Sequence, residues 1–298
     1  MSCLKIMNRG SSSKMTSFRI VHQTSYRYTD KVVLDPHYLR LFPRLGTCCV
    51  DSHDFKVTPE PAGTSSVLDA GGDRVMLAWF RKACDLLEIR SELVVRVEPF
   101  NPLHFIFYPV SCARLPMVYP SEQAAALVPY MDREEISTLA DFAASLAADS
   151  NQDTLSFLTN LCRAVCNGFS YEQRNEGAAW APAFTLKERK GCCRDFAVLA
   201  MALCRRMGIA SRYVSGYYLN DDAAGPADLH SWVEVFLPGA GWRGFDPAQG
   251  VACDHHYLAL SAAADPLQTM PVTGTFYGNA SCRMLAVLTI DRLGIDYD

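Results

Sequence analysis

The sequence predicts an α+β protein, in which an N-terminal β-sandwich-like domain precedes a core of helices packed on an antiparallel sheet. Its 298 residues are enough for two domains. Residues 17–115 hold short alternating or β-branched segments separated by turn residues, whereas residues 120–166 and 194–207 hold apolar side chains at helical spacing. We therefore expect a flexible tail over 1–16, a β-rich domain over 17–118 and a core domain over 119–298.

Strands in the first domain are predicted from β-branched runs that lie between turn clusters. The expected strands cover 18–34, 54–57, 75–80 and 93–97. The Gly71-Gly72 pair between two of them lacks the Gly-Lys-Ser/Thr sequence of a phosphate-binding loop, and no helix is signalled after it. We therefore interpret the pair as a hairpin turn.

The second domain is predicted to begin with helices. Ser121 opens an Ala-rich stretch, and apolar residues then recur at helical spacing over 132–142 and 154–165. Cys162 and Cys166 lie one helical turn apart and could form half of a metal site. No histidine or acidic pair accompanies them, so we assign both to the core.

A further helix followed by three strands completes the predicted core. The segment 194–207 is amphipathic, and Gly208 follows it in C-cap position. Strands are expected over 212–219, 231–237 and 242–245, with turn residues between them. This order predicts a helix packed on an antiparallel sheet.

Charge and hydropathy exclude several classes of protein. The chain has 28 basic and 32 acidic residues, a net charge of −4 and a pI of about 6.0, which argue against a nucleic-acid binder. The longest unbroken apolar run, Phe196–Cys204, is far shorter than the about 20 residues of a membrane-spanning helix. The polar N-terminus lacks the apolar segment of a secretory signal. We therefore predict a cytoplasmic protein that binds neither nucleic acid nor membrane.

The twelve cysteines are predicted to be free thiols. Their number is even, but a disulfide framework is typical of short secreted chains. No pair has the CxxC spacing of a zinc site, and two pairs, Cys48–Cys49 and Cys192–Cys193, are directly adjacent. We expect most of the cysteines to be small buried apolar residues in a reducing compartment.

Three residues of the core have the types that thiol catalysis requires. Cys193 lies at the predicted start of a helix, where free N–H groups and the helix dipole stabilise a thiolate and lower its pKa. His230 lies at the entry to a strand and could exchange protons with the thiol, and Asp246 at the end of the next strand could orient the imidazole. Spacing alone makes this a weak signal.

Three motifs around these residues make the signal stronger. Residues 191–197 read GCCRDFA and continue as LCRRMGIASRYVSGY over 203–217; LHSWVEV spans 229–235 and LPGAGWRGFDP spans 237–247. In order and spacing they resemble the Cys, His and Asp motifs of the transglutaminase-like, papain-related superfamily. The runs VHQTSYRY at 21–28 and LRLFPR at 39–44 are similar to the β-rich N-terminal region of bacterial transglutaminase-like proteins, which are often named as cysteine proteases.

The resemblance implies a catalytic triad. In it Cys193 is the nucleophile, His230 the general base and acid, and Asp246 the residue that orients the histidine. The substrate is then a peptide or protein, with an amine as a second substrate in one alternative, and no cofactor or metal is implied. The sequence departs from the family at Cys192, where a small or apolar residue is usual, and the motif register favours Cys193.

The sequence leaves the surroundings of the triad open. Tyr171, Gln173 and Trp180 precede the cysteine motif and are candidates for completing an oxyanion hole, and nothing distinguishes among them. Asp195 is expected to act as a first-turn partner of the helix dipole. Trp232 and Trp242 are expected to pack the sheet.

The predicted activity is acyl transfer at an amide, with hydrolysis by a cysteine peptidase or amidase favoured because no calcium site or lysine groove is marked. The alternatives are a protein-glutamine transglutaminase and a non-catalytic protein-binding module. A zinc-binding regulator is a further hypothesis, since Cys253 and Asp254 precede His255-His256. Without metal-site spacing, we place these residues in a surface loop or at a strand edge and expect no bound zinc.

Overall fold

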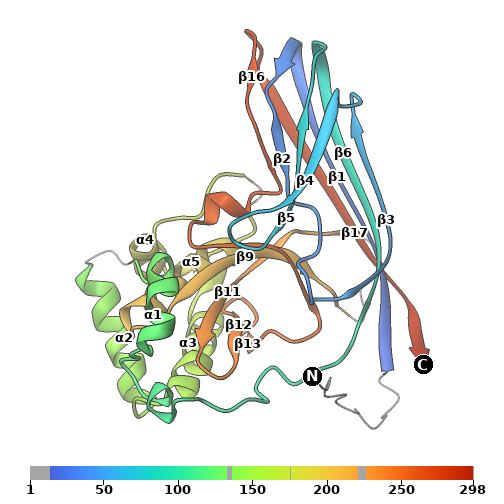
Figure 1. Ribbon diagram of the computed structural model, residues 1–298. Coiled ribbons are helices and arrows are strands. Elements are labelled where there is room, and N and C mark those ends of the chain that lie inside the picture. Colours follow the sequence, from blue (N-terminus) through green and yellow to red (C-terminus); the bar gives the residue numbers. More distant parts are fainter. Residues whose placement is uncertain (1–13, 133–135, 175, 221–225, 298) are drawn as a thin grey trace.

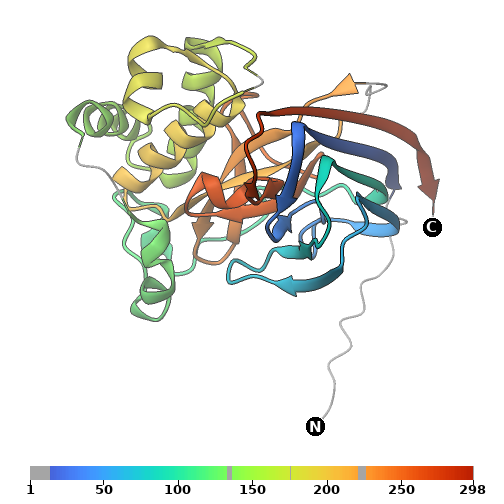
Figure 2. The ribbon, with the colours of Figure 1, turned by 90° about the horizontal axis from the view of Figure 1, so that it is seen from above.

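The computed structural model describes residues 14–132, 136–174, 176–220 and 226–297. Long strands form one part of the molecule and helices form another, with a five-stranded sheet between them (Figure 1). Seen from above, the helices cover one side of that sheet and the long strands lie on its other side (Figure 2). The α+β class predicted from the sequence is confirmed.

The long strands form two sheets. The six-stranded sheet has the order β10-β17-β1-β6-β3 with β16 paired to β1, and the four-stranded sheet has the order β15-β2-β5-β4. Side chains alternate between buried and partly exposed along most of β6, because successive residues of a strand point to opposite faces. The first sheet consists of β1 (Lys14–Leu34), β3 (Cys49–Thr58), β6 (Cys84–Val97), β10 (Pro226–Ala227), β16 (Phe276–Tyr277) and β17 (Cys282–Tyr297). The second consists of β2 (His37–Leu39), β4 (Gly63–Leu68), β5 (Arg74–Trp79) and β15 (Val272–Thr273).

The first sheet takes its strands from both ends of the chain. The whole length of β17 pairs with β1, from Lys14 opposite Tyr297 to Tyr28 opposite Cys282. The division at residue 118 stays a prediction, but this sheet contains chain from both sides of it. Residues 14–16, expected in the tail, belong to β1, while the rest of that tail lies outside the described residues.

The core sheet is antiparallel and has the order β13-β12-β11-β9-β14. Helix α5 packs on β11 and β9, and α2, α3 and α4 pack around α5, as the sequence pattern predicts for a helix on a sheet. The strands are β9 (Ser211–Tyr218), β11 (His230–Leu237), β12 (Gly241–Asp246), β13 (Val251–Ala252) and β14 (Tyr257–Ala263). The helices are α1 (Ser121–Leu127), α2 (Ser137–Asp149), α3 (Thr154–Gly168), α4 (Pro182–Glu188) and α5 (Cys193–Arg206). Short elements complete the chain: β7 (Ser170–Tyr171), β8 (Lys190–Gly191) and the 3-10 helices η1 (Val110–Ala113), η2 (Val128–Tyr130) and η3 (Pro266–Thr269).

Several local predictions are confirmed. Gly208 follows α5 with a φ of +75°, in the left-handed conformation that a helix C-cap requires. Cys162 is buried in the core among the helices. The cysteines in the described part of the chain are all free thiols. Within the same residues, every helix is too short or too polar to cross a membrane.

The hairpin turn at Gly71-Gly72 attaches the β-rich part to the core sheet. It joins β4 to β5, so the turn interpretation is confirmed. Asp73, at its end, is buried and accepts hydrogen bonds from the Ser261 hydroxyl and from the Ala262 N–H at 2.9 Å, both on β14. Arg44 forms an ion pair with the same carboxylate.

A buried histidine lies at this same junction. His22 of β1 is 3% exposed, and its Nδ1 is 3.0 Å from the hydroxyl of Tyr217 on β9. Its Nε2 is 3.3 Å from Thr24 Oγ1. Burial lowers the pKa of His22 from 6.5 to about 4, because the charged imidazolium loses its hydration there.

The buried His22 makes the folded state sensitive to acid. Its pKa is lower in the folded chain than in the unfolded one, so the unfolded chain binds the extra proton first as the pH falls. Stability is full above pH 6.5 and is expected to fall by about 3 kcal/mol as the pH drops to about 4. Urea unfolding at a series of pH values measures this loss. The variant His22→Gln should lose clearly less stability over that window, and an equal loss in both proteins would contradict the assignment.

Candidate active site

The candidate nucleophile occupies the first residue of α5. Cys192 is the N-cap, with an extended backbone, and Cys193 begins the helix. The side chain of Cys192 is 3% exposed, whereas Cys193 is half-buried and more accessible. The helix start presents N–H groups without helical partners and a partial positive charge, both of which stabilise an anion.

The two adjacent thiols titrate together. A hydrogen bond between them lowers the pKa of Cys192 to about 7 and raises the pKa of Cys193 far above its ordinary value. The pKa values of the two thiols therefore move apart, and the raised pKa of Cys193 differs from the lowered pKa expected for Cys193 alone. The carboxylate of Asp195, 3.1 Å from Cys192 Sγ, repels that charge, whereas the hydrogen bond of Tyr171 favours a thiolate on Cys193.

Asp195 binds the helix start to the segment that precedes it. Its fully buried carboxylate accepts hydrogen bonds from the N–H of Cys192 at 2.9 Å, the N–H of Trp180 at 2.7 Å and Nη2 of Arg174 at 2.5 Å. Burial acts to raise the pKa of Asp195, but these hydrogen bonds outweigh it and hold the pKa below its usual value. The expected first-turn partner of the dipole thus also holds Arg174 and the backbone of Trp180 against the helix start.

Gly191 is required for this arrangement. Its φ is +155°, and a Cβ added there would lie 2.9 Å from Cβ of Asp195. The variant Gly191→Ala is therefore expected to lose about 1–3 kcal/mol of stability. It should also react more slowly at Cys193, because the cysteine and Asp195 must shift.

Urea unfolding and the alkylation rate of Cys193 together test the role of Gly191. Gly46 is a matched control, since its φ is +80° but a Cβ there would meet nothing within 4 Å. Gly46→Ala should leave the alkylation rate unchanged. If Cys193 were alkylated at the wild-type rate in both variants, the close approach of Gly191 to Asp195 would not be needed for the reactivity of Cys193.

His230 and Asp246 are in direct contact. His230 begins β11 and Asp246 ends β12, the neighbouring antiparallel strand. The register pairs Val233 with Phe245, so Asp246 lies two residues from His230 on the same face of the sheet. His230 Nε2 is 2.7 Å from Asp246 Oδ2. This contact leaves Nδ1 as the ring nitrogen that can exchange a proton with a substrate or a thiol.

Both carboxylate oxygens of Asp246 accept hydrogen bonds. The side chain is fully buried, and Oδ1 accepts from the N–H groups of Ala248 at 2.8 Å and Gln249 at 3.3 Å. Oδ2 accepts from the hydroxyl of Tyr257 at 2.9 Å, in addition to His230. Sequence reasoning missed Tyr257, which lies on β14 and outside the three motifs. A carboxylate fixed in this way holds the imidazole in one orientation.

The helix and the sheet bring the three predicted residues to one region. Cys193 begins the helix that packs on β11, the strand that His230 begins. Asp246 is near enough to Cys193 for its negative charge to contribute to the raised pKa of the thiol. Tyr213 of β9 lies beside this region and donates a hydrogen bond to Ser231 Oγ at 2.5 Å.

The three candidates for the oxyanion hole have different environments. Tyr171 on β7 makes a hydrogen bond to Cys193. The side chain of Gln173 donates instead to Asp228 at 2.7 Å in an exposed position. The ring of Trp180 lies 4.6 Å from the Arg174 guanidinium, and the backbone N–H of Trp180 donates a hydrogen bond to Asp195. Of the three, Tyr171 is placed to act on the thiol.

The tryptophans, Cys253 and the two adjacent histidines named in the sequence analysis lie outside the candidate triad. Trp232 is fully buried in the core sheet, and Trp242 stacks under the Arg212 guanidinium at 4.1 Å. Cys253 is buried against Gly244 and Trp232. His255 and His256 lie half-buried in the turn between β13 and β14, as expected for a loop.

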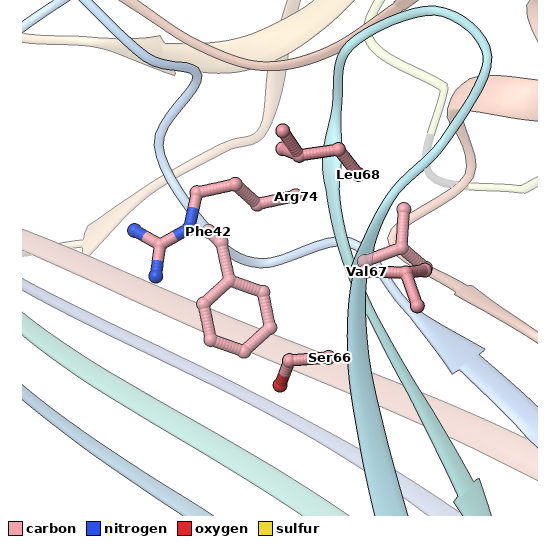
Figure 3. A pocket seen from close by; sticks show the side chains of 6 residues that line it. Phe42, Ser66, Val67, Leu68 and Arg74 are labelled. Carbon is pink, nitrogen blue, oxygen red and sulfur yellow. The ribbon is translucent and has the colours of Figure 1, made fainter.

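The cavity shown in Figure 3 lies elsewhere, on the β-rich part of the molecule. It has a volume of about 200 Å³, and its lining includes Phe42, Val67, Leu68 and the charged side chain of Arg74. None of its lining residues is a cysteine or a histidine. The candidate catalytic residues lie instead at the start of α5, the start of β11 and the end of β12.

Two protein-family models match parts of this chain. The model of the transglutaminase-like superfamily matches residues 140–247, and the model of the bacterial transglutaminase-like N-terminal region matches residues 18–96. An uncharacterised protein of Mycobacterium tuberculosis is 27% identical over 286 residues, which cover 91% of this chain and 90% of that protein. An uncharacterised protein of Mycobacterium leprae is 24% identical over 291 residues, which cover 94% and 100% of the two chains.

A solved structure shares the fold along nearly the whole chain. It is a protein from Cytophaga hutchinsonii provisionally named a cysteine protease, and it aligns with a TM-score of 0.69 over 96% of this chain and 93% of its own. At 20% sequence identity, this similarity establishes the fold alone. The two family matches together span more than half of the residues and include Cys193, His230 and Asp246. The chain therefore belongs to the transglutaminase-like superfamily.

Proposed function

We propose that the protein is a thiol-dependent enzyme that cleaves or transfers acyl groups at amide bonds, with Cys193, His230 and Asp246 as its catalytic triad. The observation that supports it most is the His230–Asp246 pair, joined at 2.7 Å, in which His230 begins β11, a strand against which the helix of Cys193 packs. A buried, fully hydrogen-bonded carboxylate paired with a histidine is the arrangement that orients a general base.

The first half of the reaction forms an acyl-enzyme. The sulfur of Cys193 attacks the amide carbonyl as a thiolate, with Nδ1 of His230 holding the thiol proton. The carbonyl becomes a tetrahedral oxyanion that the N–H groups at the start of α5 stabilise. The C–N bond then breaks, the imidazolium gives its proton to the leaving amine, and a thioester remains on Cys193.

The second half of the reaction decides between two activities. His230 removes a proton from the incoming nucleophile, which attacks the thioester and releases the thiol. Water as the nucleophile gives hydrolysis, and a primary amine gives transamidation. We favour hydrolysis of a peptide or protein substrate, with transamidation of protein glutamine as the alternative.

Trapping of the acyl-enzyme tests this proposal. The full chain is incubated with a peptide library, with and without an added primary amine, and Cys193 is analysed by mass spectrometry after rapid acid quenching. The expected result is an acyl adduct on Cys193 and peptide carboxylates in both reactions. Amide products formed only with the amine would establish transamidation instead. If no library peptide gave an adduct or a product, the enzymatic proposal would be contradicted.

A further inference from the structure

A second cluster of chemically active side chains lies in the turn between β13 and β14. Asp254, His255 and His256 each offer one metal-ligating atom, and the three atoms lie within 4.8 Å of one another. The rings of the two histidines are 4.1 Å apart between centroids. All three side chains are half-buried. Cys253, the fourth residue of this run in the sequence, is buried against the core sheet and is not part of the cluster.

The distances within this cluster suit a tetrahedral ion. With zinc–nitrogen and zinc–oxygen bonds of about 2.0–2.2 Å, neighbouring donors of a tetrahedral site lie about 3.3–3.5 Å apart. Nδ1 of His256 is 2.8 Å from Asp254 Oδ1, and Nδ1 of His255 is 3.7 Å from Asp254 Oδ2. The two nitrogens face different oxygens of the same carboxylate, and their separations from these oxygens lie on either side of the tetrahedral value. Small rotations of half-buried side chains can therefore bring the donors to one ion.

The turn is also fixed by its backbone. The N–H of His256 donates to Asp254 Oδ1 at 3.0 Å, and the N–H of Tyr257 donates to the Asp254 carbonyl at 3.1 Å. Donors held by a preformed turn lose little conformational freedom when an ion binds.

From this geometry we propose that Asp254, His255 and His256 form a binding site for a divalent transition-metal ion of the zinc type. Two imidazoles and one carboxylate suit zinc, cobalt or nickel, whereas calcium and magnesium prefer sites made of oxygen ligands. Three protein ligands leave a fourth position for water. This proposal revises the expectation from the sequence that the chain holds no metal, and it does not depend on the proposed enzymatic activity.

The site lies close to the candidate triad. The ring of Tyr218 is 6.4 Å from the ring of His256 and 5.9 Å from the ring of His230, between centroids. Tyr257, which follows His256 in the chain, donates the hydrogen bond to Asp246 at 2.9 Å. An ion bound in the turn would therefore lie next in the chain to Tyr257, the residue that supports the triad carboxylate.

Cobalt titration of the full chain tests the proposed site. It is done in the double variant Cys192→Ser/Cys193→Ser, because the adjacent thiols could bind metal themselves. We expect one equivalent of Co²⁺ to bind, with a visible spectrum of nitrogen and oxygen ligation and no thiolate charge-transfer band. No binding at millimolar Co²⁺, or a spectrum dominated by thiolate ligation, would overturn the proposal.

Matched variants locate the ion. Changing a residue that only supports a metal ligand typically costs 10–100-fold in affinity, so loss of a ligand in Asp254→Asn or His256→Ala should weaken binding by about tenfold or more. His104→Ala removes an exposed histidine outside the cluster and should leave the affinity unchanged. Zn²⁺ should raise Tm in the parent double variant and less in Asp254→Asn, which keeps the size of the side chain. Equal affinities and equal Tm shifts in all these proteins would place the metal elsewhere.

Discussion

Replacement of Cys193 by serine is expected to lower kcat/KM by about a thousandfold or more, because a serine hydroxyl at this position is a far weaker nucleophile than a thiolate. The stability of the variant should stay close to that of the wild type, since Cys193 is half-buried and serine has a similar size. Peptide hydrolysis, or amine incorporation if that is the activity found, measures the first effect. Thermal unfolding measures the second.

Cys192→Ser is the matched control for this experiment. Its hydroxyl can still donate to Asp195 Oδ2, which lies 3.1 Å from the native sulfur, so the helix start should stay in place. We expect this variant to keep most of the activity. The reverse pattern, with Cys193→Ser active and Cys192→Ser inactive, would show that Cys192 is the nucleophile and would contradict the assignment to Cys193.

Removal of the imidazole in His230→Ala is expected to have the second largest effect, a loss of about 10²–10⁴-fold in kcat/KM, the range that a positioned general base contributes. The partner Asp246 is fully buried and would lose one of its hydrogen bonds, so some loss of stability accompanies the loss of activity. Activity and thermal unfolding are therefore measured on the same samples.

Chemical rescue separates the catalytic role of His230 from a merely structural one. Free imidazole should restore part of the activity of His230→Ala, since it can enter the space left by the side chain and act as the base. The control His104→Ala, at an exposed histidine, should keep full activity and show no response to imidazole. If His230→Ala were as active as this control, the proposed base would be wrong.

The sequence predicted the local elements of the site because their signals are local. Cys193 and Gly208 mark the two ends of α5, whose apolar spacing is visible in the chain itself. His230 and Asp246 mark the ends of two strands joined by a short turn, so their meeting follows from a hairpin register. Short-range pairing of this kind can be deduced from residue order.

Contacts between distant segments could not be deduced in this way. β17 pairs with β1 although more than 200 residues separate them, and the sequence of neither segment indicates which strand it pairs with. Tyr257 reaches Asp246 only because β14 lies beside β9, a pairing that depends on the whole sheet. Asp195 was expected to act on the helix dipole, and its bonds to Arg174 and Trp180 depend on how the preceding segment folds back.

Comparison of the alkylation rate at Cys193 in the wild type and in His230→Ala tests the central claim of a histidine-activated thiol most directly. Iodoacetamide reacts with the thiolate, and labelling at Cys193 can be followed separately from Cys192 by peptide mass spectrometry. At neutral pH we expect labelling of Cys193 in the wild type to be at least about tenfold faster than in the variant, because the imidazole no longer holds the thiol proton. Labelling of Cys193 at the same rate in both proteins would contradict activation of this thiol by His230.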